Sequence, residues 1–265
     1  MKRILTIILI YGITNPIISQ TIFEEPVNSG NIITLFKVIT LFKDKDLSNL
    51  LHPNHDKQFK PSYDGVIGSN YRRIQIHFSS IEKTNNPYVY LIQGKSKVGD
   101  NVFPFIGNIT ITHAVKMNKD IIDEEMAYEI GRVNGFIKGN YVFHETPKEK
   151  SRGIFKGEIN LNWGLNEYGI IVSSFTDNYV ASKHTITYKG IWESYNTGNK
   201  LTCCWSDYQI PCAPDDFNVS NGYDIIPNEK YSRNGWENVR TLYIESENSP
   251  EWKKAFEAEI KEWWR

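Results

Sequence analysis

The six histidines are the residues of this sequence best suited to acid–base catalysis or metal binding. His113 follows Ile111 at an alternate position, and His184 shares the alternation of Tyr188 and Trp192. Because alternate residues of a strand share one face, these side chains are predicted to face the apolar interior of a sheet. All five are therefore candidate ligand-binding residues, with core histidines held by hydrogen bonds as the alternative. A hydrolase that uses either histidine with a nearby carboxylate is a second hypothesis.

The other histidines do not predict a metal site. His52 and His55 have a His-x-x-His spacing next to Asp56, but Pro53 lies between them and prevents a regular helix from presenting both side chains. No third ligand follows, so we interpret the pair as loop histidines. The sequence contains neither the Gly-x-Ser-x-Gly motif of hydrolases nor the His-Glu-x-x-His motif of zinc proteases. We therefore expect no metal and no cofactor, and a non-enzymatic protein in preference to an enzyme.

The three cysteines predict one disulfide in an oxidising compartment. Cys203 shares its strand face with Leu201 and Trp205, which indicates an inward position, whereas Cys204 would point outward. Cys204 is therefore the better partner for Cys212, and this bridge would tie the following loop to its strand. Three free thiols in a reducing compartment are the alternative.

The first 19 residues have the layout of a secretory signal peptide. Lys2 and Arg3 precede the apolar residues 4–10, and Ser19 offers a small residue for cleavage. A short N-terminal strand is the alternative. No later stretch approaches the roughly 20 apolar residues of a membrane helix, so we expect a secreted or periplasmic protein without a transmembrane segment. Removal of Lys2 and Arg3 takes the 30 basic residues to 28 against 31 acidic ones, a balance that does not suit a nucleic-acid partner.

Residues 70–246 have mainly the pattern of β structure. Short turns join the strand-like segments, which predicts antiparallel neighbours. Glycine recurs inside five of them, where it indicates bends at the corners of a closed sheet. We therefore predict an antiparallel up-and-down β-barrel of about eight or nine strands, with a sandwich as the alternative. The predicted strands are residues 71–79, 88–98, 102–115, 132–145, 153–163, 168–175, 184–195, 200–206 and 238–245.

Helices are predicted on both sides of this region. Residues 20–69 would form an N-terminal helical segment and linker, with a short helix at residues 47–51. Residues 247–265 would form a C-terminal amphipathic helix capped by Ser249. Its apolar stripe predicts a helix packed outside the barrel, and a helix that binds a protein partner is the alternative. The stripe consists of Trp252, Phe256, Ile260 and Trp263.

Four segments of the β region carry a resemblance to known proteins: YRRIQIHF at 71–78, YVYLIQGKSKV at 88–98, FIGNITI at 105–111 and YKGIWESYNTGNKLTCCW at 188–205. They resemble uncharacterised secreted bacterial proteins with a calycin-like barrel, the group that includes lipocalins and avidins. Gly190-Ile191-Trp192 also matches the glycine-any-tryptophan signature of lipocalins, although in that family it opens the first barrel strand. The resemblance covers residues 70–245. It implies an up-and-down barrel with a helix against its wall and carries over no activity.

These features support three hypotheses for the function. The leading one is a secreted, non-enzymatic barrel that binds a small apolar or amphiphilic ligand, because barrels of about eight strands can just hold one. Its lumen would include Ile111, Tyr188 and Trp192 besides the two histidines. The second hypothesis is the hydrolase described above. The third is a structural or interaction module whose barrel is filled by its own side chains and whose surface meets a protein partner.

Overall fold

The structure, a computed structural model, describes residues 42–53, 62–116, 132–146, 151–165, 168, 170–173, 186–220 and 224–265. The predicted signal peptide at residues 1–19 lies outside these ranges, as do His184 and most of the predicted N-terminal helical segment. Within the described ranges, no helix has both the length and the apolar character that crossing a membrane requires.

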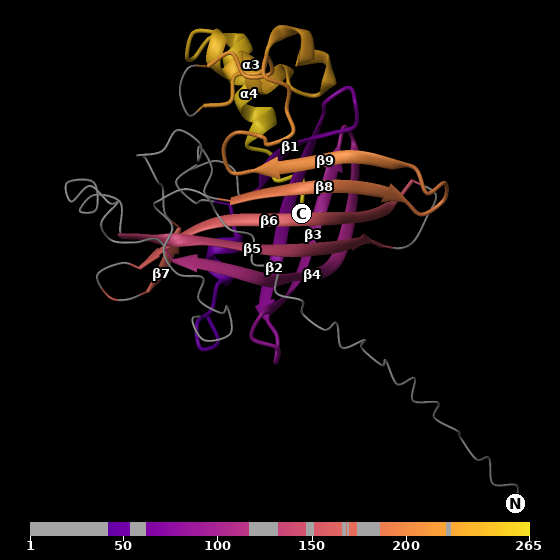
Figure 1. Cartoon of the computed structure of the whole chain (residues 1–265). Helices are drawn as coiled ribbons and strands as arrows, with labels where there is room; N and C mark the ends of the chain where they lie inside the picture. The colour runs from indigo at the N-terminus through magenta and orange to yellow at the C-terminus, as the bar shows by residue number, and fades with distance from the viewer. Residues whose placement is uncertain are drawn as a thin grey trace, which may run out of the picture. The chain divides into compact units, whose positions relative to one another are not determined.

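The strands form a closed antiparallel barrel in which neighbouring strands follow one another along the chain (Figure 1). The last strand of the wall pairs back with the first, where Trp205 lies opposite Gly65. The predicted up-and-down barrel is thereby confirmed. A short strand, β7 (Ile171–Ser173), pairs with the end of β6. The wall consists of β1 (Tyr63–Ile67), β2 (Arg72–Lys83), β3 (Val89–Val98), β4 (Asn101–Lys116), β5 (Arg132–Glu145), β6 (Gly153–Leu165), β8 (Ile186–Ser194) and β9 (Lys200–Ser206).

The barrel begins and ends earlier in the chain than the predicted residues 70–246. Residues 63–67, which were predicted as loop, form β1 and pair with both β2 and β9. Residues 238–245, which were predicted as the last strand, lie instead in helix α3 (Glu237–Ile244). The physical reason is that β1 already closes the described wall, so a strand at 238–245 would have no edge to pair with.

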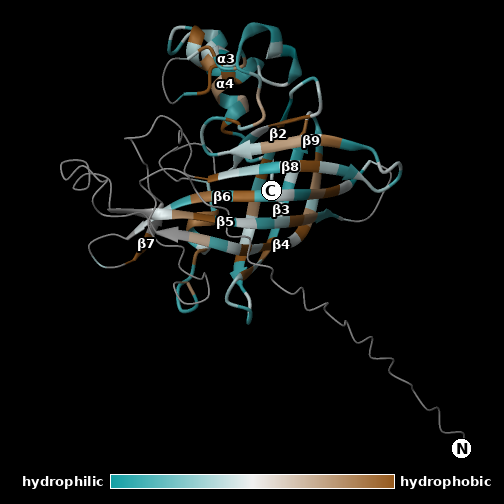
Figure 2. Cartoon of the chain, in the orientation of Figure 1, coloured by the Kyte–Doolittle hydropathy of each residue, from teal (hydrophilic) through white to brown (hydrophobic). Residues whose placement is uncertain are grey.

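Aromatic side chains fill the middle of the barrel. Tyr188 stacks on Trp205 with ring centroids 5.1 Å apart, and Phe105 stacks on Phe143 at 5.1 Å. Inward-facing glycines make room for such rings, since a Cβ atom at Gly94 would lie 2.5 Å from the Phe105 ring. Aromatic rings that cover glycines are a recurring device in curved sheets. Figure 2 shows the alternation of hydrophobic and hydrophilic residues along the strands. The buried core also includes Tyr63, Phe78, Tyr141 and Phe155.

Residues 42–53 close one end of the barrel. They contain the short 3₁₀ helix η1 (Ser48–Leu51), which lies within the predicted helix at this place. The Tyr63 hydroxyl donates a hydrogen bond to the Leu51 carbonyl at 2.8 Å. The Lys83 ammonium donates to three carbonyls of the segment, at 2.5 to 3.4 Å. The apolar side chains that join the barrel core from this segment are Phe42, Leu47, Leu50 and Leu51.

An outer lobe, residues 207–220 and 224–265, packs on the outer face of the wall beside β1 and β9 (Figure 1). Its own hydrophobic core contacts Val66 of β1 and Cys204 of β9. A disulfide between Cys204 and Cys212, with Cα atoms 5.8 Å apart, also joins the lobe to β9. The helices of the lobe are η3 (Glu229–Asn234), α3 and α4 (Pro250–Glu259).

Buried charges attach helix α4 to the barrel wall. Glu259, the last residue of the helix, accepts hydrogen bonds from the Arg73 guanidinium at 2.6 and 2.8 Å. Arg73 also forms an ion pair with Asp64 at 2.8 Å. At the other end of the helix, the Ser249 hydroxyl accepts a hydrogen bond from the Trp252 amide at 3.1 Å. A C-terminal helix packed outside the barrel is therefore confirmed, but it covers Pro250–Glu259 rather than residues 247–265, and its buried residues are Ala255 and Glu259 rather than those of the predicted apolar stripe.

Candidate functional site

The alternation of its strand predicts that His113 faces the barrel interior. The structure places this side chain on the outside of the barrel instead. A β-bulge interrupts the pairing of β4 with β5 between Ile111 and His113, and Thr112 is the extra residue. A bulge of one residue reverses the alternation of the residues that follow it. Ala114 is therefore buried and His113 is exposed, which corrects its assignment as a ligand-binding residue of the lumen.

The other predicted ligand-binding residues separate into two groups. Ile111 and Tyr188 face the barrel interior, but they pack within the filled core and do not line the cavity described next. Trp192 does line that cavity. His184 lies outside the described residues. The hydrolase hypothesis thus loses His113 as a lumen group.

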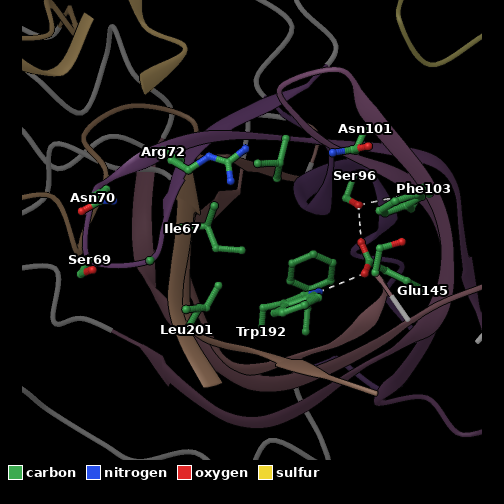
Figure 3. A pocket seen from close by; sticks show the side chains of 14 residues that line it. Ile67, Ser69, Asn70, Arg72, Ser96, Asn101, Phe103, Glu145, Trp192 and Leu201 are labelled. Atoms are coloured by element: carbon green, nitrogen blue, oxygen red, sulfur yellow. Dashed lines mark hydrogen bonds between the residues drawn. The ribbon is translucent and has the colours of Figure 1, made fainter. Parts of the chain in front are cut away.

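A cavity of about 330 Å³ opens at the end of the barrel opposite residues 42–53. This open end, called the mouth below, is where four hairpin connections of the wall meet. Figure 3 shows side chains in a ring around it, with Ile67 and Leu201 on one side and Phe103 and Glu145 on the other. The described residues of these connections are 67–72, 98–101, 145–146, 151–153 and 194–200.

The lining of the mouth is amphiphilic. Ile67, Phe155 and Leu201 give the cavity an apolar side, and the indole of Trp192 continues it toward Glu145 (Figure 3). Polar and charged groups complete the lining, so that a bound molecule would meet both kinds of surface. These groups include Arg72, Ser96, Asn101 and Glu145.

Glu145 is the chemically distinctive residue of the mouth. Its side chain is only 3% exposed, yet it is ionisable and faces a cavity. Its Oε1 accepts a hydrogen bond from the Ser96 hydroxyl at 2.6 Å. Its Oε2 accepts from the Gly153 amide at 2.8 Å and from the Trp192 indole N–H at 3.0 Å. Residues from three strands, β3, β6 and β8, therefore hold this carboxyl group in one orientation.

Burial raises the pKa of the Glu145 carboxyl above its ordinary value. The hydrogen bonds from Ser96, Trp192 and Gly153 oppose that rise, and so does the nearby charge of Arg152. The direction follows because removing a carboxylate from water disfavours its charged form, whereas donors directed at its oxygens favour that form. The site thus contains a desolvated acid that its neighbours stabilise in the ionised state.

Sequence reasoning missed Glu145, although a signal for it was present. The residue ends the predicted strand 132–145 and shares the alternation of Tyr141 and Phe143, both of which are buried. An inward position for an acid at the end of a strand could have been inferred from that alternation. Its partners could not, because Ser96, Gly153 and Trp192 come from strands far apart in the sequence.

Metal binding finds no support in the described residues, where no three or more His, Cys, Asp and Glu side chains gather closely enough to hold an ion. His77 lies outside the lumen, with its ring stacked on Trp264 at 4.6 Å between centroids. Comparison of the chain with protein-family models, curated proteins and solved structures gave no match.

Proposed function

We propose that this protein is a non-enzymatic binding protein of the calycin type, which takes up a small amphiphilic ligand at the mouth of its barrel. The observation that carries the proposal is a cavity of about 330 Å³ that combines apolar side chains with one buried carboxyl group. Small-molecule sites in proteins are typically concave and mostly apolar, with a few placed polar groups.

The filled core limits where and how large the ligand is. Tyr141, Tyr188 and Trp205 occupy the middle of the barrel and residues 42–53 occupy its far end. The ligand therefore binds at the mouth alone, and it is small, since the cavity of about 330 Å³ lies near the lower end of the roughly 300–1,000 Å³ range of ligand pockets.

We also propose that the protein is exported and acts outside the cytoplasm. The Cys204–Cys212 disulfide supports this proposal, because such bonds form and persist in oxidising compartments. The layout of residues 1–19 is the other support.

Blocking the mouth tests the binding function. In Leu201→Trp, an indole would occupy the cavity, so we expect the neutral naphthalene dye prodan to bind about tenfold more weakly, or not at all. Ile106→Trp places the same bulk on the outer face of β4, where Ile106 is 41% exposed, and should bind the dye as the wild type does. Dye fluorescence in a titration measures both affinities.

Equal thermal unfolding of the two variants would show that both are folded. If the wild-type protein does not bind the dye, or if the two variants bind it equally, ligand binding at the mouth is wrong. A barrel filled by its own side chains, acting as an interaction module, would then be the better explanation.

A further inference from the structure

We propose that the mouth is selective for organic cations: ligands that place an ammonium group beside Glu145 and an apolar body against the aromatic side chains of the cavity. This inference rests on the proposed ligand binding at the mouth and specifies the chemical class of the ligand.

The first support is the hydrogen bonding of the Glu145 carboxyl group. The Gly153 amide and the Trp192 indole both donate to Oε2, and neither group can accept a proton in return. They therefore favour the ionised carboxylate. A carboxylate has about four acceptor positions, so Oε1, which accepts one bond from Ser96, keeps capacity for a donor from the ligand.

The second support is the balance of charge around Glu145. Buried charges in proteins are normally paired with an opposite charge. Among the described residues, the ion pairs do not include one to Glu145. The charge of Arg152 lowers the pKa of Glu145, and its guanidinium donates a hydrogen bond to the Thr146 carbonyl. Arg152 also contributes least of the groups that lower the pKa of Glu145. A ligand cation would supply the missing counter-charge.

The third support is the aromatic character of the lining around the carboxylate. Phe103, Phe155 and Trp192 all line the cavity, and Figure 3 shows Phe103 and Trp192 close to Glu145. Aromatic faces attract ammonium groups, and desolvation strengthens this attraction. The Arg152 guanidinium carbon lies 4.6 Å from the Phe103 ring centroid, so this ring already contacts a cation of the protein, and Trp192 and Phe155 are the rings left for a ligand. The same set of rings suits a ligand cation and the apolar body beside it.

Other ligand classes fit these features less well. An anion would be repelled by the Glu145 carboxylate. Arg72 could attract it only at the rim, where its side chain is exposed and water screens the charge. A neutral alcohol can donate a hydrogen bond to Oε1 but leaves the buried charge without a partner. Of these three classes, only a cation with an N–H group can both donate a hydrogen bond to Oε1 of Glu145 and neutralise the carboxylate charge.

Protonation of Glu145 would remove this selectivity. In the part of the chain that the structure describes, the charged and titratable groups that line the cavity with Glu145 or interact with it electrostatically include Arg72, Arg152, Tyr195 and Cys203. Burial raises the pKa of the Tyr195 hydroxyl and of the Cys203 thiol, so both stay neutral in acid, and the two arginines stay charged. Glu145 is then the group that changes charge. Cation binding should weaken as the pH falls through its raised pKa, while the binding of a neutral ligand persists.

Three probes with one apolar body test the proposal on the full chain: 2-phenylethylamine as the cation, 2-phenylethanol as the neutral molecule and 3-phenylpropionate as the anion. Each is titrated at neutral pH while NMR follows the indole N–H of Trp192, which donates to Glu145. We expect the amine to bind about tenfold more tightly than the alcohol, since charge-assisted hydrogen bonds are the stronger ones. The anion should bind most weakly.

Glu145→Gln is the decisive variant, because it keeps the shape of the side chain and removes its charge. We expect it to lose the preference for the amine and to bind the amine and the alcohol with about equal affinity. If this variant does not fold, the loss of the amine preference in acid decides the question on the wild-type protein.

The outcomes separate the two proposals. An amine that binds no more tightly than the alcohol, or less tightly than the anion, overturns cation selectivity and leaves ligand binding at the mouth intact. A preference for the amine that survives in Glu145→Gln also overturns it. If neither the probes nor prodan bind, ligand binding at the mouth fails as well.

Discussion

The two ends of this barrel are formed by the same strands, but they differ in the chemical groups that face the interior at each end. At the closed end, Leu51 of the N-terminal segment is fully buried, and the Tyr63 hydroxyl binds its carbonyl at 2.8 Å. At the mouth, Leu201 is 39% exposed, and the buried group on the other side of the cavity is the carboxyl of Glu145 (Figure 3). One end is thus completed by apolar side chains and backbone carbonyls, the other by a cavity with an acid.

A single strand shows the same contrast along its length. The inward residues of β5 run from Ile137 through Tyr141 and Phe143 to Glu145 at the mouth, and all four are buried. The first three lie in the hydrophobic core, while the last requires three hydrogen bonds to be held there. Burial by itself therefore does not mark a site. A buried polar group is a better indication of a site when its hydrogen-bond partners lie at the opening of a cavity.

The largest difference between the two ends should appear in stability when a leucine is truncated. We expect Leu51→Ala to lower the free energy of unfolding by about 3 kcal/mol, because it removes a fully buried side chain and leaves a void. Leu201→Ala should cost less than about 1 kcal/mol, since water already reaches that side chain. Urea denaturation of both variants measures the difference. Equal losses would contradict the distinction between a packed end and an open one.

Removing a hydroxyl group at each end should give smaller and unequal losses. Ser96→Ala deletes a donor to the Glu145 carboxylate and should cost about 2 kcal/mol near neutral pH, because hydrogen bonds to charged groups are the more stabilising. Tyr63→Phe deletes a donor to the Leu51 carbonyl and should cost about 1 kcal/mol. Denaturant titrations compare the two. A larger loss in Tyr63→Phe would mean that Glu145 is not ionised in the folded protein.

The smallest effect should be a change in how stability depends on pH. Because burial raises the pKa of Glu145, the folded state binds its proton more tightly than the unfolded state does. This contribution to stability is complete below the unfolded pKa and is lost as the pH rises through the folded pKa. Glu145→Gln lacks the titration, so its stability relative to the wild type should increase as the pH rises from about 4, near the unfolded pKa, through the raised pKa of the folded state.

Denaturation of both proteins at each pH measures that relative stability. A difference that stays constant would show that the three hydrogen bonds to Glu145 balance its burial, and a difference that decreases with rising pH would show that they outweigh it.

The fold was largely predictable from the sequence because its signals are local. Strict alternation, short turns and repeated glycines are enough to predict an antiparallel barrel, and the cap at Ser249 with Pro250 after it predicts α4. The errors came from distant parts of the chain. Residues 63–67 are too short a run to identify as a strand until both of its neighbours are known, and the helix at 237–244 is understandable only once the wall has closed.

The candidate site was much less predictable. Trp192 was identified from its alternation, but the same alternation misplaced His113, because the position of a bulge depends on the partner strand. Glu145 was not identified, because it was only a single charge at the end of a predicted strand. Its chemistry arises from contacts with Ser96, Gly153 and Trp192, and no short motif connects these residues.

The sequence by itself therefore determined the wall of this protein: which faces of its strands are apolar, which strands carry an internal glycine, and where a helix begins near the C-terminus. Only the tertiary structure decided that the middle of the barrel is filled, that one end is closed and that the other presents a buried acid. The physical reason is the separation along the sequence of the residues that interact. Alternation and capping act between residues a few positions apart, whereas cavities and buried charges depend on side chains that meet only when distant strands close into a barrel.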